Sequence, residues 1–280
     1  MPGRFVFVAN NRSGSFDQAL VDALMARAGE LGLGVPEARY LPDNSCPSPG
    51  ELSPDDIVAV FGGDGTIGSV IRSLAGWSGS ALVLPGGTMN LASKRLHGDV
   101  AAMDIIEAVG GGRTRRRRPT VITSPVGDSL AGVMVGPGTS WSDVREAMRD
   151  LDLAGLASST VRAFATTRGG ARVICRDPAI GREDGYPMVE VLPTAGGMSL
   201  SGYKADDLGE FAVGLAALLR HDFRSGPCDS FDLADRVTIA AVDGAPVGIL
   251  VDGDPIDPQQ QVTLAVGTSK VDLLVTAPDA

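Results

Sequence analysis

The sequence predicts two successive domains, an α/β domain followed by an antiparallel β-rich domain. In the first 110 or so residues, apolar strand-like runs alternate with segments of helical spacing, which is typical of α/β folds. After the glycine run at 110–112, short β-like segments separated by Gly, Pro and Asp predominate. The chain has 280 residues, 44% of them hydrophobic, so it can bury a core in one large or two modest domains.

The first part carries the signals of a parallel sheet. Apolar runs predict strands over 5–9, 57–61 and 81–84. Helical stripes cover 20–31 and 67–74, a further helix is expected over about 99–109, and a loop rich in Pro, Ser and Asn covers 42–54. Strands joined by helical crossovers predict a mostly parallel sheet with helices on both faces.

The second part carries the signals of an antiparallel sheet domain, because several of its segments alternate with period 2. Strands are expected over 121–122, 130–135, 161–166, 172–175, 189–192, 236–242, 247–251, 262–266 and 271–276. A single helix is expected among them, with an apolar stripe from Leu208 to Leu218 and a cap at Asp206-Asp207.

The charge balance argues against one class of function. The chain has 24 basic and 34 acidic side chains, a net charge of −10 and a pI near 4.7. General nucleic-acid binding needs clustered Lys and Arg to neutralise phosphates, so we expect no nucleic-acid partner. Five arginines nevertheless cluster, at Arg113 and Arg115–Arg118.

Several features favour a cytoplasmic protein. No apolar run approaches the ~20 residues of a membrane span, and the N-terminus lacks the pattern of a signal peptide. The three cysteines (Cys46, Cys175 and Cys228) include no CxxC pair, which favours a reducing compartment. We expect them to be buried as small hydrophobic side chains. The two histidines exclude a His-rich metal site.

The strongest chemical signal is Gly62-Gly63-Asp64-Gly65-Thr66, between an expected strand and an expected helix. Glycines let the backbone approach a ligand closely, and a helix N-terminus presents free N–H groups to phosphate. Thr66 can donate a hydroxyl hydrogen bond. A carboxylate such as Asp64 would repel phosphate unless it holds a metal ion or its water. The alternative is an ordinary turn in which Asp64 is a cap.

Two further turns follow expected strands in the same half. One is Pro85-Gly86-Gly87-Thr88-Met89-Asn90, with Thr88 and Asn90 at a helix entrance, and the other runs from Asn10 to Ser15. Taken alone, each also fits a plain polar turn. Ligands of such sheets bind at the carboxyl ends of strands, so three turns together favour a binding site. The GxxxxGK[ST] loop is absent from the sequence.

In this order and spacing, the three turns resemble the diacylglycerol kinase catalytic domain family, which includes bacterial soluble lipid kinases and the sphingosine and ceramide kinases. GGDGT is shared with the NAD kinases of the same superfamily. Three later segments are also similar to the family: a glycine turn at 135–138, a strand at 234–239 and an Asp-Gly-Asp turn at 250–254. The PGGTMN turn and the late Asp-Gly-Asp turn point to the lipid branch.

The resemblance implies a two-domain enzyme. Residues 1–117 plus about 268–280 would form an NAD kinase-like α/β nucleotide domain, and 118–267 an antiparallel β-sandwich that binds the lipid. Asp252 would be the general base, and Asp64 and Asp254 would hold Mg²⁺. ATP would be bound by residues of the three turns: Asn10, Ser13, Gly62, Gly63, Asp64, Gly65, Thr66, Gly87, Thr88 and Asn90.

The chemistry of Asp252-Gly253-Asp254 agrees with this role. In an extended segment, alternation points both carboxylates to the same side, and a carboxylate near the acceptor hydroxyl can act as a base. Asp-Gly is also a common hairpin turn, and we interpret Asp243-Gly244 as only such a turn. Three positions depart from the family's usual residues: Asn11 for Pro, Leu91 for Asp and Asp254 for Glu.

The sequence therefore predicts an ATP- and Mg²⁺-dependent lipid kinase of phospholipid metabolism that contacts the inner face of the membrane peripherally. Its acceptor is a lipid hydroxyl, as in diacylglycerol, ceramide or a sphingoid base. One alternative is an NAD kinase-like enzyme with a soluble acceptor. Another is a nucleotide-binding regulator that does not catalyse, which Leu91 and Asp254 would favour. The lipid, its acyl chains and the oligomeric state stay open.

The arginine run has two interpretations. It is either a solvated interdomain strand that pairs with the acidic excess, or a patch that meets anionic lipid. A strand sends alternate side chains to opposite faces, so the whole run cannot face one bilayer.

Overall fold

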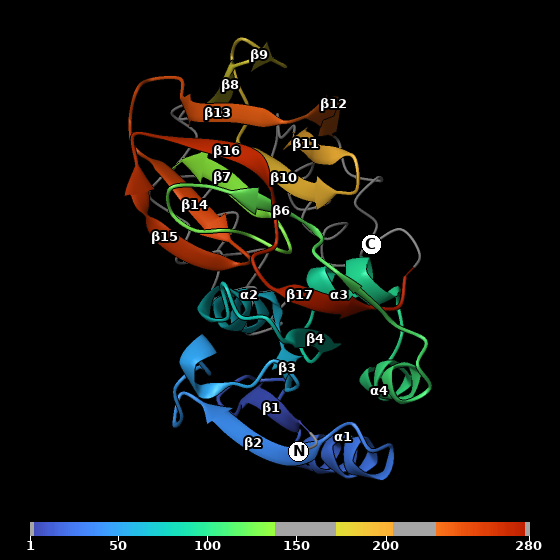
Figure 1. Cartoon of the computed structure of the whole chain (residues 1–280). Helices are drawn as coiled ribbons and strands as arrows, with labels where there is room; N and C mark the ends of the chain where they lie inside the picture. The colour runs from blue at the N-terminus through green and yellow to red at the C-terminus, as the bar shows by residue number, and fades with distance from the viewer. Residues whose placement is uncertain (1–2, 138–171, 204–227, 278–280) are drawn as a thin grey trace. The chain divides into compact units, whose positions relative to one another are not determined.

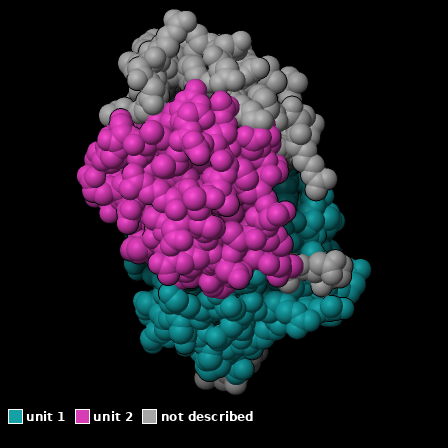
Figure 2. Space-filling model, turned by 90° about the horizontal axis from the view of Figure 1, so that it is seen from above, with its two compact units in different colours: residues 1–120, 268–280 teal, residues 121–267 magenta. Residues whose placement is uncertain are grey.

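Contacts within the chain separate it into two units, residues 1–120 with 268–280 and residues 121–267 (Figure 2). This computed structural model describes residues 3–137, 172–203 and 228–277. The sequence placed the domain boundary after residue 117, whereas the contacts divide the chain after residue 120. The expected strand 161–166 and the expected helix over 208–218 lie outside the described residues.

The first unit contains a six-stranded sheet in the order β2-β1-β3-β4-β17-β5 (Figure 1). Neighbours from β2 to β17 pair in parallel, and only β5 runs antiparallel, against β17. The strands are β1 (Arg4–Asn10), β2 (Val35–Leu41), β3 (Ile57–Gly62), β4 (Ser80–Pro85), β5 (Arg115–Arg117) and β17 (Asp272–Val275). A 3-10 turn, η1 (Pro49–Glu51), lies between β2 and β3.

Helices cover both faces of this sheet (Figure 1). Phe5, Phe7 and the other odd-numbered side chains of β1 share a core with α1 (Gln18–Glu30) and α4 (Ala102–Gly110). On the other face, α2 (Asp64–Ser73) packs on β3 and α3 (Leu91–His97) packs on β4. Strands buried on both faces read as continuous apolar runs, which is why β1, β3 and β4 were predictable.

The end of the chain is fastened to α3. The backbone amides of Thr276 and Ala277 donate to the carbonyl of Leu96 at 3.2 and 3.0 Å. His97 Nδ1 lies 3.1 Å from Thr276 Oγ1. Burial lowers the pKa of His97 to about 4, outweighing a backbone contact at Val83 that raises it, so the ring is neutral near pH 7. These bonds link the segment after β17 to the last residues of α3.

The second unit is an antiparallel β-sandwich. One sheet has the order β12-β11-β10-β7-β14-β15 and the other β6-β16-β13-β8-β9. Valines and isoleucines from the two inner faces form one core, for example Val135, Val191 and Ile249 against Val237 and Leu264. The predicted fold class, an α/β domain followed by an antiparallel β-sandwich, is confirmed.

The strands of the sandwich have these bounds: β6 (Thr120–Thr123), β7 (Val133–Pro137), β8 (Val173–Asp177), β9 (Ala179–Ile180), β10 (Met188–Thr194), β11 (Gly197–Tyr203), β12 (Cys228–Ala234), β13 (Arg236–Ala241), β14 (Val247–Val251), β15 (Asp254–Gln259) and β16 (Gln261–Thr268).

Three sequence predictions need correction. Residues 135–137 are not a turn but the last three residues of β7, where Val135 pairs with Val189 and Ile249; Gly138 lies outside the described residues. The strand expected over 130–135 begins only at Val133, because the preceding residues form a loop. Of the cysteines only Cys175 is buried, which raises the pKa of its thiol to about 11, and Cys46 and Cys228 are half-buried.

No helix among the described residues combines the length and the apolar character that crossing a bilayer requires.

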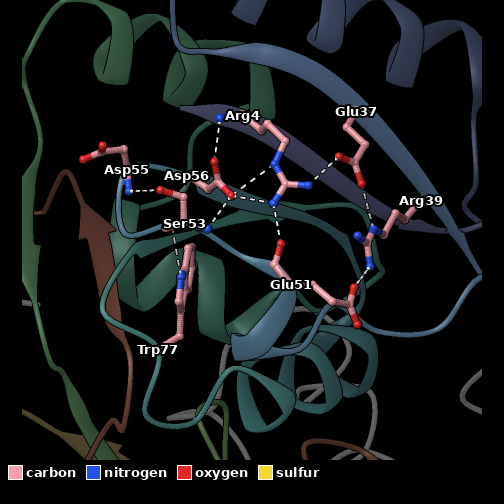
Figure 3. Close-up of polar contacts among 8 residues, drawn as sticks. All are labelled: Arg4, Glu37, Arg39, Glu51, Ser53, Asp55, Asp56 and Trp77. Atoms are coloured by element: carbon pink, nitrogen blue, oxygen red, sulfur yellow. Dashed lines mark hydrogen bonds and ion pairs between the residues drawn. The ribbon is translucent and has the colours of Figure 1, made fainter. Parts of the chain in front are cut away.

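A charged network ties the starts of the strands in the first unit together (Figure 3). The backbone amide of Arg4 donates to Asp56 Oδ1 at 2.7 Å, and the Arg4 guanidinium donates to Asp56 Oδ2 at 2.7 Å. Arg4 also reaches Glu37 of β2 at 3.0 Å, and Asp56 accepts the amide of Ser53 at 2.8 Å. Trp77 Nε1 donates to the carbonyl of Ser53 at 3.2 Å. The network therefore joins β1, β2 and the entry to β3.

We expect Asp56→Asn to destabilise the first unit by about 3 kcal/mol, because it removes the buried carboxylate that accepts the Arg4 guanidinium and the Ser53 amide. Asp56 is 2% exposed. Burial raises its pKa, but hydrogen bonds from Arg4 and Ser53 outweigh burial, so the net pKa lies below its ordinary value. A lowered folded pKa contributes stability above the unfolded pKa of about 3.9 and loses it as the pH falls further.

Urea unfolding followed by the fluorescence of Trp77 in a Trp141→Phe background measures this effect. The gap between the parent protein and Asp56→Asn should shrink as the pH falls below about 4. Asp55→Asn is the matched control, since Asp55 is exposed and its carboxylate is outside the network. An equal loss in both variants, or a gap that does not change with pH, would contradict the assignment.

Candidate functional site

The three predicted turns follow neighbouring strands of the first sheet. β1, β3 and β4 are adjacent and parallel, so the segments after Asn10, Gly62 and Pro85 emerge at the same edge. Strand β1 pairs with β2 on one side and with β3 on the other. This is a topological switch point, the place where open α/β sheets bind ligands.

Side chains of the first turn reach both other turns. Asn10 Nδ2 donates to Thr66 Oγ1 at 3.4 Å, at the start of α2. Ser15 Oγ donates to the carbonyl of Gly86 in the third turn. Within the first turn, Ser13 Oγ lies 3.1 Å from Ser15 Oγ. The backbone amide of Ser13 donates to the carbonyl of Asn10. Asn10 and Ser13, which the family resemblance assigns to the nucleotide, therefore lie beside the Gly-rich turns.

The glycines of the second and third turns touch each other. The amide of Gly86 donates to the carbonyl of Gly62 at 3.1 Å. A Cβ on Gly86 would lie 2.7 Å from Gly62 N, and a Cβ on Gly87 would lie 2.5 Å from Gly63 Cα. Side chains do not fit at these distances, so the two turns approach backbone to backbone. The sequence predicted that the glycines let the backbone approach a ligand closely. In the structure, they let the backbones of the second and third turns approach each other.

Asp64 caps a helix, but not its own. Its Oδ1 accepts the amide of Ala92 at 2.9 Å and its Oδ2 accepts the amide of Leu91 at 3.1 Å. These are the first amides of α3, whose N-cap residue, Asn90, makes no side-chain cap. A carboxylate at a helix N-terminus is favourable for both charge and hydrogen bonding. The second turn thus holds the third turn and α3 in place.

Asn90 has a backbone conformation that is unusual for a residue with a side chain. Its φ is 52°, in the left-handed region. The side chain closes a small loop, accepting the amide of Gly87 and donating to its carbonyl, each at 2.8 Å. Thr88 lies exposed within this loop. The loop directs the chain from β4 into α3.

The start of α2 supplies donors at this edge. α2 begins at Asp64 after Gly63, and no side chain caps it. The first amides of a helix have no acceptor within the helix, so those of Gly65 and Thr66 are suited to an anion. The residues predicted for the nucleotide thus come together in the first unit.

Asp252 belongs to the second unit and lies in a hairpin turn. Val251 pairs with Asp254, and Asp252 and Gly253 have φ values of 53° and 85°. Positive φ at both central residues identifies a type I′ turn between β14 and β15. The expectation of an extended segment with both carboxylates on one side is therefore wrong. The residues described include only one other non-glycine position with positive φ, Asn90.

The side chain of Asp252 nevertheless differs from that of an ordinary hairpin turn. It is 4% exposed. Its Oδ1 accepts the Ser129 hydroxyl at 2.6 Å and the Ala131 amide at 2.8 Å, and its own amide donates to Gly132 at 3.0 Å. In the comparable turn, Asp243 is exposed and only accepts the amide of Ala245. Burial and two donors hold the Asp252 carboxylate in one orientation.

Sequence reasoning missed Ser129 and Ala131, because they fell in or beside an expected strand. The available sequence signal was Gly132 inside an apolar run, since an isolated glycine in a strand pattern suggests a bulge or a close approach of backbone. Asp254, the predicted metal ligand, is the first residue of β15 and is half-buried. Within residues 3–137, 172–203 and 228–277, no group of three or more His, Cys, Asp or Glu side chains is placed to hold a metal ion.

The comparisons with known proteins agree with this architecture. Residues 47–120, which include the second and third turns, match the diacylglycerol kinase catalytic domain. No curated protein matches the chain. Two solved structures of a "putative diacylglycerol kinase" from Bacillus anthracis str. Sterne have TM-scores of 0.65. They are 13% and 12% identical in sequence, and each alignment covers 99% of this chain and 98% or 99% of the other.

A third structure, of a diacylglycerol kinase from the same organism, has a TM-score of 0.62 at 13% identity. It covers 99% of this chain and 98% of that chain. At such identities the likeness establishes the fold alone, which spans both units. The sequence evidence for the diacylglycerol kinase catalytic domain is the match of residues 47–120.

Proposed function

We propose that this protein is an ATP-dependent lipid kinase. Its matched segment and its fold both support the diacylglycerol kinase catalytic domain family, which is a family of kinase-type phosphotransferases. The acceptor would be a lipid hydroxyl, as in diacylglycerol, ceramide or a sphingoid base. The observation that carries the proposal is the convergence of three turns at the switch point of the first sheet, where Asp64 of the second turn caps the helix that follows the third.

The three turns suit the phosphates of ATP. Amides at the start of α2 would donate to phosphate oxygens, and Thr66, Thr88 and Asn90 offer polar side chains. Phosphoryl transfer depends on positioning and charge stabilisation more than on covalent catalysis. The backbone contact between the second and third turns would contribute to that positioning.

Asp252 would act as the general base. It would accept the proton of the lipid hydroxyl while that oxygen forms its bond to the γ-phosphorus and ADP leaves. The hydrogen bonds from Ser129 and Ala131 occupy Oδ1 and fix the orientation of the carboxylate. This role rests on the family resemblance together with the burial of the side chain.

Mg²⁺ would be held by Asp64 and Asp254. Mg²⁺ is usually bound by one or two carboxylates together with substrate phosphates and water, so a cluster of three protein ligands is not required. Each carboxylate oxygen has two lone pairs, so Asp64 can accept an amide and still face a cation. When bound, Mg²⁺ would neutralise the charge that develops on the phosphates.

The proposal is tested by phosphoryl transfer from labelled ATP in the presence of Mg²⁺. The acceptors are diacylglycerol, ceramide, sphingosine and monoacylglycerol in mixed micelles, with NAD⁺ as a separate soluble acceptor. We expect label in a lipid product and none in NADP⁺. Label in NADP⁺ alone would instead identify an NAD kinase-like enzyme. ATP binding without any product would favour the non-catalytic regulator.

A further inference from the structure

The arginine strand β5 separates its side chains into two sets. Arg116 and Arg118 both donate through Nε to Asp272 of β17, each at 2.8 Å. Arg116 also donates to the carbonyls of Ser78 and Gly79. This set matches the structural interpretation of the run, because both guanidinium groups pair with an acidic side chain of the first unit.

The second set is different. Arg115 and Arg117 alternate with the first set, so they point to the opposite face of the strand. Both are exposed. Among the ion pairs and hydrogen bonds of the described residues, none involves their side chains. Arg113, which lies two residues before Arg115, is also exposed. We call Arg113, Arg115 and Arg117 the basic edge.

The position of the basic edge leaves it accessible. β5 is the last strand of its sheet and pairs only with β17. Arg115 and Arg117 lie opposite Val275 and Leu273, which are buried. Their alkyl stems can therefore rest on the sheet while the guanidinium groups extend into solvent. Alternate residues of a strand are about 7 Å apart, so the edge presents a row of separate cations.

We propose that the basic edge docks the protein on an anionic lipid bilayer. The chain has a net charge of −10, so this exposed row of arginines is opposite in sign to the molecule as a whole. Such an asymmetry orients a protein at a charged surface, because acidic groups farther away than the Debye length of about 8 Å are screened. This inference deepens the proposed function, since a lipid acceptor resides in a membrane, and its test requires no catalysis.

The chemistry favours a bilayer over nucleic acid. A row along one strand edge matches a flat anionic surface, whereas nucleic-acid binding in an acidic protein would require a broader basic groove with aromatic side chains for stacking. Edge arginines also discourage pairing between sheets of separate molecules. That alternative predicts a change in oligomeric state and none in membrane binding.

The experiment is co-sedimentation with vesicles of phosphatidylcholine alone or with one third phosphatidylglycerol, without ATP and without any candidate acceptor. The parent protein should bind only the anionic vesicles. Arg115→Gln with Arg117→Gln should weaken binding by about 30-fold, from about fivefold for each arginine at the surface. Raising the salt from about 0.1 M to about 1 M should abolish binding, because the Debye length falls to about 3 Å.

The matched control is Arg176→Gln with Arg236→Gln, which removes the same charge from exposed positions of the second unit. It should bind the anionic vesicles like the parent protein. The proposal is overturned by equal losses in both double variants, by binding to an oligonucleotide but not to vesicles, or by a variant that changes only oligomeric state. Vesicle binding without phosphoryl transfer would overturn the proposed function but leave this inference standing.

Discussion

Asp252→Asn is expected to reduce phosphoryl transfer by about a thousandfold, within the range that a positioned general base contributes. Asparagine has nearly the same shape, and its Oδ1 can still accept the Ser129 hydroxyl and the Ala131 amide. The fold of the second unit should therefore persist. ATP affinity should also be unchanged, because the predicted nucleotide residues belong to the first unit. The turnover number and calorimetric ATP binding measure these two effects.

The protein contains its own control for this experiment. Asp243 is also followed by glycine, in the turn that leads from β13 to β14 of the other sheet, but its carboxylate is exposed and accepts the nearby backbone amide of Ala245. Asp243→Asn should retain the full turnover number. If Asp252→Asn kept the turnover of the parent protein, Asp252 could not be the base. If ATP binding were lost as well, the variant would be reporting on structure instead.

Asp64→Ala is expected to lower activity by at least about a hundredfold, because misplacing a reacting group by about 1 Å can cost that much. The substitution leaves the amides of Leu91 and Ala92 without their charged acceptor. We expect a loss of about 2–4 kcal/mol in the stability of the first unit. Activity at saturating ATP and urea unfolding measure the two consequences.

A Mg²⁺ titration separates the two roles proposed for Asp64. If Asp64 holds Mg²⁺ as well as α3, both Asp64→Ala and Asp64→Asn should need a higher Mg²⁺ concentration for half-maximal activity. An unchanged requirement in both variants would leave Asp64 as a helix cap and refute the metal assignment. Asp17→Ala serves as the control, because Asp17 caps α1 through the amides of Ala19 and Leu20. It should cost about 1 kcal/mol in stability and leave the Mg²⁺ requirement unchanged.

The strands that the sequence predicted are mostly those with buried side chains. β1, β3 and β4 are apolar runs because both their faces are covered. Most of the strands that were missed, β2, β9, β12 and β15, lie at sheet edges. β15, with the sequence DPIDPQ, is mostly exposed and contains two prolines, which edge strands tolerate. The interior strand β11, GMSLSGY, was missed because Gly and Ser weaken its alternation.

The local sequence also determined where the three turns lie, since each follows an apolar strand and the first strand of each βα unit ends at the same edge. It identified Asp64 and Asp252 as residues to test. Their partners were not predictable. Asp64 accepts amides 27 and 28 residues away, and Ser129 is 123 residues from Asp252.

By itself, then, the sequence determined most of the buried strands, the class of each domain and the positions of the three turns, because burial and backbone preference leave a local pattern. Only the tertiary structure decided that the glycines of two turns touch, that Asp64 caps α3, that Asp252 is buried in a left-handed turn, and that the arginine run has one set paired with Asp272 and one set that extends into solvent. Each of these depends on contacts between segments far apart in the chain, which leave no periodic signal in either segment.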